Sequence, residues 1–481
     1  MSYYKDIKFT LKVVINRQNP KVLFAEADSV FADVLLSFLS LPLGTIVRLL
    51  QKHYGDEAPV IGSLTTLSNG LSDLDISNFW NEGRKRMLLN PISSFYDDDT
   101  DRATKYFCCE DWDCVFSKKT NMSMYYGIGR CDCRRPLIRE VPMRNASRND
   151  GGGDDDDDDG FFVVRGTTFI TSDDLLIMPN AAGSVIRILG DLGINDADWG
   201  EMKDVTFGFN EIMDLLKCSL LSRTPLTDIV LNKGQITFAT PTESGLLLPK
   251  VERKKTHDSD TMILRVMIQK STNSLLFAQV EEDFIDVLFS LLIIPLGGVE
   301  CLLDGNTCLK NIDNLYKSVK DLSNDKYLDA DKALYSLIDP KVPHGYISDN
   351  QILPIEEEEG PRKVYYYRGS GPHDDFVSLS HDMGGSCVKV ISPKFQKGQN
   401  SYVKGPRMYV VNDDLSVKPS CMASYLSNLN GLKIPISDVN ELVLHVGLEE
   451  TLSILKASLS SNSALSNGLK HLLKKKPKQE H

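Results

Sequence analysis

The sequence predicts an α+β protein made of two homologous tandem domains. Three observations carry this prediction. The chain contains an internal repeat, each copy starts with short segments of alternating apolar and polar residues, and longer segments with helical apolar spacing follow them. Alternation with a period of two is typical of a half-buried strand, and apolar residues three and four positions apart are typical of a helix.

The internal repeat is clearest near the start of each copy. Residues 11–44 align with residues 264–297 without a gap, and 15 of these 34 positions are identical. Two shorter matches follow in the same order: TSDDLLIMP at 171–179 with VNDDLSVKP at 411–419, and LLKCSL at 215–220 with ILKASL at 454–459. Matches that keep their order along the chain indicate a tandem duplication.

The repeat sets the predicted domain boundaries. We expect a first repeat domain over 5–232, a linker over 233–258, a second repeat domain over 259–473 and a basic tail over 474–481. Within the first domain we expect a cysteine-rich hairpin at about 105–140 and a disordered acidic loop at about 145–160. That loop contains six consecutive aspartates flanked by glycines, which repel one another and have no apolar residue to bury.

Each domain is expected to open with a hairpin and a helix. Phe9, Leu11, Val13 and Ile15 alternate with polar residues, and a turn at 17–20 leads into a second strand at 22–25. Apolar residues at helical spacing then run over 31–39, and a Pro-Leu-Gly segment ends the helix.

The first helix of each domain also contains an acid, Asp33 in the first copy and Asp286 in the second. A repeated acid in an apolar helix could indicate a catalytic role. Since unpaired acids are seldom buried, we expect a carboxylate at the exposed edge of the helix or one bonded to a backbone donor.

The distal part of each domain predicts a strand, a turn, a strand and further helices. In the first copy we expect paired strands at 161–164 and 168–170, then a strand at 175–178 and a helix at 210–221, with a counterpart at 448–458. Asp173 and Asp174 lie between two of these strands. Aspartate side chains favour tight turns because they bond the backbone two residues on, so we expect a turn rather than a cation site.

Charge and hydropathy exclude several classes of protein. The chain has 54 basic and 66 acidic side chains, a formal charge of −12, which argues against a general nucleic-acid binder. The longest uncharged apolar stretches, 34–47 and 287–299, are shorter than the roughly 18 to 20 residues that cross a bilayer. The first thirty residues show no signal peptide. We therefore expect a soluble protein of the cytoplasm or nucleus, without membrane insertion and with reduced cysteines.

Five of the ten cysteines lie close together in the first copy. Cys109 and Cys114 have the spacing C-x4-C, sixteen residues follow, and Cys131 and Cys133 have the spacing C-x-C. Two thiolate pairs on a short hairpin resemble a zinc ribbon, and a closed set of four sulfurs would make the zinc structural. Cys108 as the first ligand, or free thiols without metal, are the alternatives. The second copy keeps no such spacing.

Three classes of function remain. No phosphate-binding, dinucleotide-binding, zinc-protease or serine-hydrolase motif occurs, so no catalytic residue is predicted, although an enzyme with a site between the repeats stays open. A nucleic-acid role would use Arg130, Arg134, Arg135 and Arg139, which Glu110, Asp111 and Asp113 dilute. We favour a non-enzymatic interaction or regulatory protein with a protein partner, because duplicated domains offer two related surfaces.

Four segments together resemble a known family. They are VLFAEADSVFADVLLSFLSLPLGTIVRLL from residue 22, the Y-x-C-C…C…C-x-C cluster, TSDDLLIMP, and LLKCSLLSRTPLTD from residue 215. The chain resembles, over nearly its whole length, the plant-specific domain-of-unknown-function family six-seven-four. The resemblance implies tandem repeats and brings no activity, cofactor or catalytic residue with it.

Overall fold

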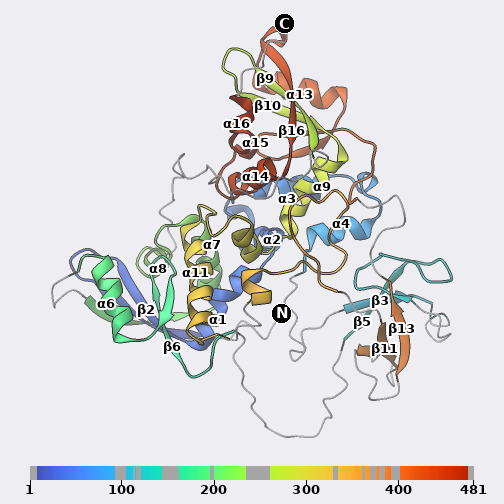
Figure 1. Cartoon of the computed structure of the whole chain (residues 1–481). Coiled ribbons are helices and arrows are strands. Elements are labelled where there is room, and N and C mark those ends of the chain that lie inside the picture. Colours follow the sequence, from blue (N-terminus) through green and yellow to red (C-terminus); the bar gives the residue numbers. More distant parts are fainter. Residues whose placement is uncertain are drawn as a thin grey trace.

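The computed structural model describes residues 8–92, 105–111, 114, 121–143, 162–194, 200–233, 261–328, 334–359, 363–368, 375–378, 385–391 and 401–474. The predicted acidic loop at 145–160 lies outside these residues, as do all of the predicted linker except residue 233 and all of the basic tail except residue 474. Figure 1 shows two lobes, each built around a sheet, and a smaller group of strands to one side of them.

The first lobe is built on a five-stranded sheet with the strand order β7-β6-β2-β1-β8. Its strands are β1 (Phe9–Asn16), β2 (Val22–Asp28), β6 (Thr168–Ser172), β7 (Ile177–Pro179) and β8 (Gly200–Phe207). β1 and β2 form the predicted hairpin, with Lys12 opposite Glu26. The predicted alternation places Leu11 and Val13 in the core. The strand expected at 161–164 is wrong, since the described part of it forms only a bridge between Val163 and Leu328.

Helices cover both faces of this first sheet. On the core side lie α1 (Ser29–Ser37), α7 (Phe209–Leu221) and α8 (Pro225–Val230), and on the outer side lies α6 (Ala182–Asp191). Asp28 caps α1 by accepting a hydrogen bond from the main-chain N–H of Phe31 at 2.9 Å, which satisfies one of the free donors at a helix start.

The second lobe repeats this arrangement with the order β15-β14-β10-β9-β16. Its strands are β9 (Met262–Gln269), β10 (Leu275–Val280), β14 (Tyr409–Asn412), β15 (Val417–Pro419) and β16 (Val439–Val446). The helices are α9 (Glu282–Ser290), α13 (Met422–Leu432), α14 (Leu448–Ser460), α15 (Ala464–Gly468) and α16 (Lys470–Leu473). The strand order of one sheet therefore equals that of the other, strand for strand.

Each lobe also contains a helix that the other half of the chain supplies. α11 (Lys310–Asn324) packs in the first lobe beside α1 and α7, as Figure 1 shows. There the main-chain N–H of Ile177 donates to Ser318 Oγ at 2.9 Å. α3 (Leu64–Asp73) packs against β15 and α9 of the second lobe, and Ser63 Oγ donates to the main-chain oxygen of Ser461 at 2.7 Å.

The repeated Pro-Leu-Gly segments meet between the lobes. Pro42 and Pro295 form an antiparallel bridge, the N–H of Leu43 donates to Ile294 O, and the N–H of Leu296 donates to Leu41 O, both at 3.0 Å. α2 (Leu43–Tyr54) and α10 (Leu296–Leu302) begin at these two prolines. In the first half, α4 (Glu82–Leu89) comes after α2 and α3 along the chain. One continuous hydrophobic core takes buried residues from both halves of the chain. The domain boundaries drawn from the sequence stay a prediction.

A strand module made from both halves completes the fold. It contains the pair β3 (Lys105–Cys109) and β5 (Leu137–Pro142) and a sheet with the order β12-β11-β13-β4. In this sheet β4 (Asn121–Met122) of the first half pairs in parallel with β13 (Ser386–Val390), next to β11 (Lys363–Tyr367) and β12 (Phe376–Ser378). Short helical turns occur at Phe38–Ser40, Gly55–Glu57, Ile76–Asn78, Leu291–Ile293, Leu334–Ile338 and Ile436–Asp438.

The mixed composition agrees with the predicted α+β class. Of the helices formed by described residues, none is long and apolar enough to cross a membrane.

Candidate metal centre

The strand pair β3 and β5 decides which of the neighbouring cysteines can face the others. Successive side chains of a strand point to opposite faces. Cys108 packs in the apolar cluster between the two sheets of the strand module, whereas Cys109 packs with Cys131 and Leu137 on the other side. Both thiols are fully buried. The structure therefore brings Cys109, and not Cys108, to the remaining cysteines of the cluster.

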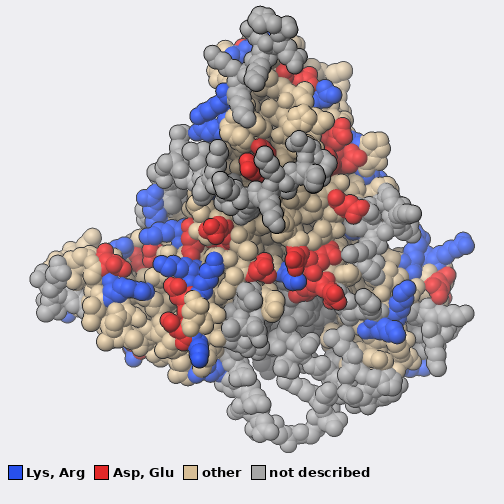
Figure 2. Space-filling view, viewed as in Figure 1, with Lys and Arg blue, Asp and Glu red and all other residues tan. Residues whose placement is uncertain are grey.

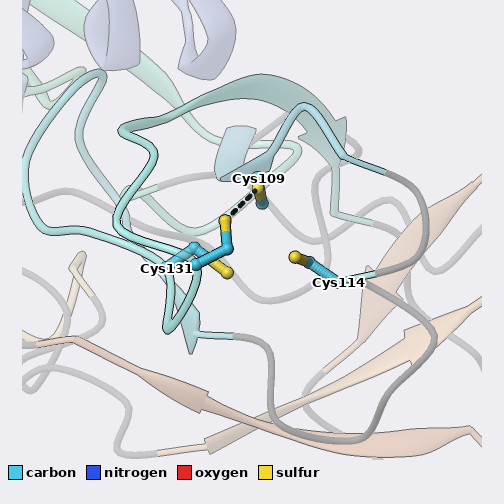
Figure 3. A group of neighbouring side chains, drawn as sticks. Cys109, Cys114 and Cys131 are labelled. Atoms are coloured by element: carbon cyan, nitrogen blue, oxygen red, sulfur yellow. Dashed lines mark hydrogen bonds between the residues drawn. The ribbon is translucent and has the colours of Figure 1, made fainter.

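The four cysteines selected by spacing come together in space. The sulfur atoms of Cys109, Cys114, Cys131 and Cys133 all lie within 4.8 Å of one another, and those of Cys109 and Cys133 are 3.5 Å apart. Figure 3 shows the labelled thiols converging from separate stretches of chain. In a tetrahedral zinc site with Zn–S bonds of 2.3 Å, neighbouring sulfurs lie about 3.8 Å apart. The cluster is thus close to the size that a metal ion such as zinc requires.

A tight turn positions the second pair of cysteines. The N–H of Cys131 donates to Arg135 O at 2.9 Å, and the N–H of Arg134 donates to Cys131 O at 2.7 Å. Arg134 has a φ of +69°, the left-handed conformation that lets the chain reverse within these five residues. Cys131 is buried and Cys133 exposed, so the turn holds one sulfur inside and one at the surface.

The thiols of Cys109, Cys114 and Cys133 differ in how readily they ionise. The main-chain N–H of Arg135 lowers the pKa of the Cys133 thiol to about 7. Burial raises the pKa of Cys109 to about 11, and hydrogen bonding to Cys133 raises that of Cys114. Metal binding requires thiolates, so it would release protons and strengthen with rising pH. None of the ten cysteines, all of which belong to the described residues, forms a disulfide.

The four arginines near this cluster do not form one open basic surface. Arg135 pairs with Asp111 at 2.8 Å. Arg139 points into the strand module and pairs with Asp375 of the second half at 3.2 Å. Arg130 donates to the main-chain oxygen of Arg134, and both side chains are exposed. Figure 2 shows acidic and basic side chains interspersed on the visible face. Of the acids expected to dilute the cluster, Asp113 lies outside the described residues.

The repeated helix acids bond the backbone, as expected. Asp33 Oδ1 accepts the main-chain N–H groups of Phe162 and Val163, each at 2.9 Å. Asp286 does the same for Tyr402 at 3.0 Å and Val403 at 3.2 Å. Asp286 is fully buried, so the exposed-edge alternative is wrong for the second copy. Each acid fixes a distal segment to the first helix of its repeat, which is a structural role.

The Asp-Asp pairs also hold chain segments together. Asp173 accepts the N–H and the hydroxyl of Thr227 at the start of α8, both at 2.8 Å. Asp413 accepts the N–H of Ser466 at 2.7 Å and its hydroxyl at 2.9 Å in α15. The predicted turn is present in both copies, and in the second copy Asp414 Oδ1 accepts the N–H of Ser416 two residues on. These bonds leave little of Asp173 and Asp413 for a cation.

Sequence reasoning missed one buried polar cluster in the strand module. Asp375 is 5% exposed and accepts both the Arg139 guanidinium and the Tyr366 hydroxyl. Burial raises the pKa of the Tyr366 phenol to about 12, which keeps it a donor. No local pattern reveals this cluster, because Arg139 of β5 lies more than 200 residues before Tyr366 of β11 and Asp375, which directly precedes β12.

Comparison with known proteins agrees with the resemblance seen in the sequence. A family model with the description "Protein of unknown function (DUF674)" matches residues 5–447. No curated protein and no solved structure was found to match the chain. Because the family model spans most of the 481 residues, the chain belongs to the DUF674 family.

Proposed function

We propose that this protein is a non-enzymatic interaction or regulatory protein whose strand module is stabilised by a structural zinc ion. The proposed ligands are Cys109, Cys114, Cys131 and Cys133. The convergence of their four sulfur atoms within 4.8 Å is the observation that carries the proposal. Four sulfurs fill a tetrahedral coordination sphere and leave no position for a substrate or a catalytic water.

The position of the cluster supports a structural role for the metal. Cys109 ends β3, Cys131 and Cys133 precede β5, and Cys114 belongs to the chain between β3 and β4. A zinc ion bound to all four would fix both connections of the β3–β5 pair. That pair packs against β11 and β13 of the second half, so the metal would also stabilise contact between the two halves.

The proposed partner is another protein, in the cytosol or nucleus. Ten cysteines that form no disulfide suit a reducing compartment. The two sheets have the same strand order and thus offer two related surfaces on one chain. The nucleic-acid alternative would use four arginines near the cysteines. Two of them, Arg135 and Arg139, form ion pairs with acids of the described residues, so only the other two would be available to bind phosphate.

Metal analysis of the purified full-length protein tests the zinc site. We expect about one zinc per chain by emission spectrometry, and less than about half of that in a Cys131→Ser variant. Cys108→Ser and Cys387→Ser are the matched controls, because neither thiol belongs to the cluster, and both should keep the zinc. Metal-free wild-type protein, or zinc that survives Cys131→Ser, would contradict the site.

Native mass spectrometry of protein purified from its source tests the wider proposal. A stable complex with a second protein, kept alongside the bound zinc, is the expected result. A chain that carries only a small molecule, and converts it on incubation, would favour the enzyme alternative instead.

A further inference from the structure

The outer face of the first sheet contains a cavity of about 320 Å³. Val14 and Phe24 form its floor on β1 and β2, Val185 of α6 lies at one wall, and Gly200 at the start of β8 lines it as well. Two polar side chains, those of Glu26 and Asn180, also line the cavity. Small-molecule sites have volumes from about 300 Å³ upward and pair an apolar lining with a few polar groups.

The second lobe shows what occupies the same place in the other copy. α13 follows β15 as α6 follows β7, and both helices pack on the outer face of their sheet. The N–H of Val185 donates to Ala181 O, and that of Tyr425 donates to Cys421 O, which makes Val185 and Tyr425 equivalent. The repeat alignment likewise makes Phe24 equivalent to Phe277.

Tyr425 fills the second copy of the cavity. Its ring lies 5.9 Å from that of Phe277, measured between centroids, and its hydroxyl hydrogen-bonds to Ser420 Oγ. Tyr425 also shares an apolar cluster with Val439, which stands at the strand position that Gly200 holds in the first sheet. In the second lobe, the phenol side chain of Tyr425 therefore fills the volume that is open in the first lobe.

Three replacements open the cavity in the first copy. Val185 stands in place of Tyr425, Gly200 in place of Val439, and Val14 in place of the longer Met267. The hydrogen-bonding position is kept, because Asn180 stands where the second copy has Ser420. Asn180 donates its side-chain amide to Thr168 Oγ1 at 3.2 Å, which leaves its side-chain carbonyl as an acceptor.

We propose that the cavity over Phe24 binds a small aromatic molecule with a phenolic hydroxyl. The ring lies against Phe24 in the volume that Tyr425 fills in the other lobe, and the hydroxyl donates to Asn180. Offset or edge-to-face contact between aromatic rings favours such a ligand over an aliphatic one of equal size. Glu26, whose partner Lys12 lies 3.8 Å away, adds a carboxylate that suits a second donor on the ligand. The proposal is independent of the zinc site.

Fluorine NMR of the full-length protein with 4-fluorophenol tests the proposal, with fluorobenzene as the matched probe. We expect one saturable site for 4-fluorophenol with a Kd of about 1 mM or tighter, a usual value for so small a ligand. Fluorobenzene should bind about fivefold more weakly, because it lacks the hydrogen bond to Asn180. In an Asn180→Ala variant the two probes should bind equally.

Reciprocal exchange between the repeats separates this cavity from other sites. Val185→Tyr copies the second repeat and should weaken binding at least tenfold, whereas Tyr425→Val combined with Val439→Gly and Met267→Val should create a second site and raise the stoichiometry to two. Absence of saturable binding, or binding that survives Val185→Tyr, would overturn the proposal. If Val185→Tyr does not fold, the proposal is overturned when the triple variant of the second repeat keeps a stoichiometry of one and Asn180→Ala keeps the wild-type preference for 4-fluorophenol.

Discussion

Asn314 of α11 donates its side-chain amide to the main-chain oxygen of Asp174 at 2.8 Å, although 140 residues separate the two in the sequence. One turn earlier, Asn311 donates to the main-chain oxygens of Ser219 at 3.1 Å and Ser222 at 2.8 Å. One face of α11 is thus bonded to the backbone of the first half. The second half of the chain supplies a helix that completes the first lobe.

The opposite exchange occurs in the second lobe. The N–H of Ser63 donates to Ser458 O at 3.0 Å, and the hydroxyl of Thr66 donates to Asp414 O. Asp414 is the repeat equivalent of Asp174, and Ser458 that of Ser219. Because each half contributes a helix to the other lobe and both share one core, we expect the two halves to unfold together.

An Asn311→Ala substitution should destabilise the whole chain. Asn311 is 2% exposed, and its loss leaves two buried carbonyl oxygens without a side-chain donor. We expect the free energy of unfolding in urea to fall by about 2 to 3 kcal/mol. Exposed Asn440→Ala is the control and should change it by less than about 0.5 kcal/mol. Two separate transitions, with only one shifted, would show that the lobes unfold independently.

The glycines of the repeated Pro-Leu-Gly segments should differ in their tolerance of a side chain. A Cβ at Gly297 would lie 2.0 Å from the main-chain oxygen of Leu337, whereas one at Gly44 would lie 3.0 Å from that of Leu292. We expect Gly297→Ala to cost at least about 3 kcal/mol, or to prevent folding, and Gly44→Ala to cost about 1 kcal/mol. Urea unfolding and yield of folded protein measure both, and equal tolerance would contradict the close packing at Gly297.

The local elements could be predicted from the sequence because local patterns encode them. The alternation over 9–15 and the helical spacing over 31–39 correspond to β1 and to α1 with its following turn. The exchange of α3 and α11 could not be predicted in this way. It depends on long-range contacts, and both helices show only the amphipathic pattern that any partner would satisfy.

The candidate site could also be predicted only in part from the sequence. Spacing selected Cys109, Cys114, Cys131 and Cys133 but left Cys108 open as the first ligand. In the structure, the alternation of side chains along β3 places Cys109, and not Cys108, beside the other three. The roles of the arginines were beyond sequence reasoning. The partner of Arg139 is Asp375, 236 residues further along the chain, and no local pattern links them.

Replacement of Asp286 by asparagine should alter how stability depends on pH. Burial raises the pKa of the Asp286 carboxyl to about 7, while an unfolded aspartate titrates near about 4. Between about pH 4 and 7 the Asp286 carboxyl is therefore protonated in the folded state and ionised in the unfolded state. The stability from this group is complete below about pH 4 and decreases as the pH rises through 7.

The wild-type protein should accordingly lose stability relative to Asp286→Asn as the pH rises from 5 to 8. We expect a relative loss of about 1 to 3 kcal/mol, since one pKa unit corresponds to about 1.4 kcal/mol. Urea unfolding at several pH values measures it, with the exposed Asp56→Asn variant as the control. A difference between wild type and Asp286→Asn that stays constant over this range would show that the carboxyl keeps one charge state.

Loss of the Asp375 carboxylate should loosen the strand module. Asp375→Asn removes the charge that faces Arg139, whose side chain is 18% exposed, and breaking such a buried pair costs about 3 kcal/mol. Cys108 lies fully buried between the two sheets that this pair joins, and burial raises the pKa of its thiol. We expect iodoacetamide to modify Cys108 at least tenfold faster in Asp375→Asn than in the wild type.

Peptide mass spectrometry over a time course measures this rate, with buried Cys218 of α7 as the internal reference. Glu140→Gln is the matched control, because it breaks an exposed ion pair with Lys105 on the same strand pair. Exposed pairs contribute little, so this variant should leave Cys108 protected. Equal labelling of Cys108 and Cys218 in Asp375→Asn would indicate global unfolding, and an unchanged Cys108 rate would show that apolar packing alone holds the sheets together.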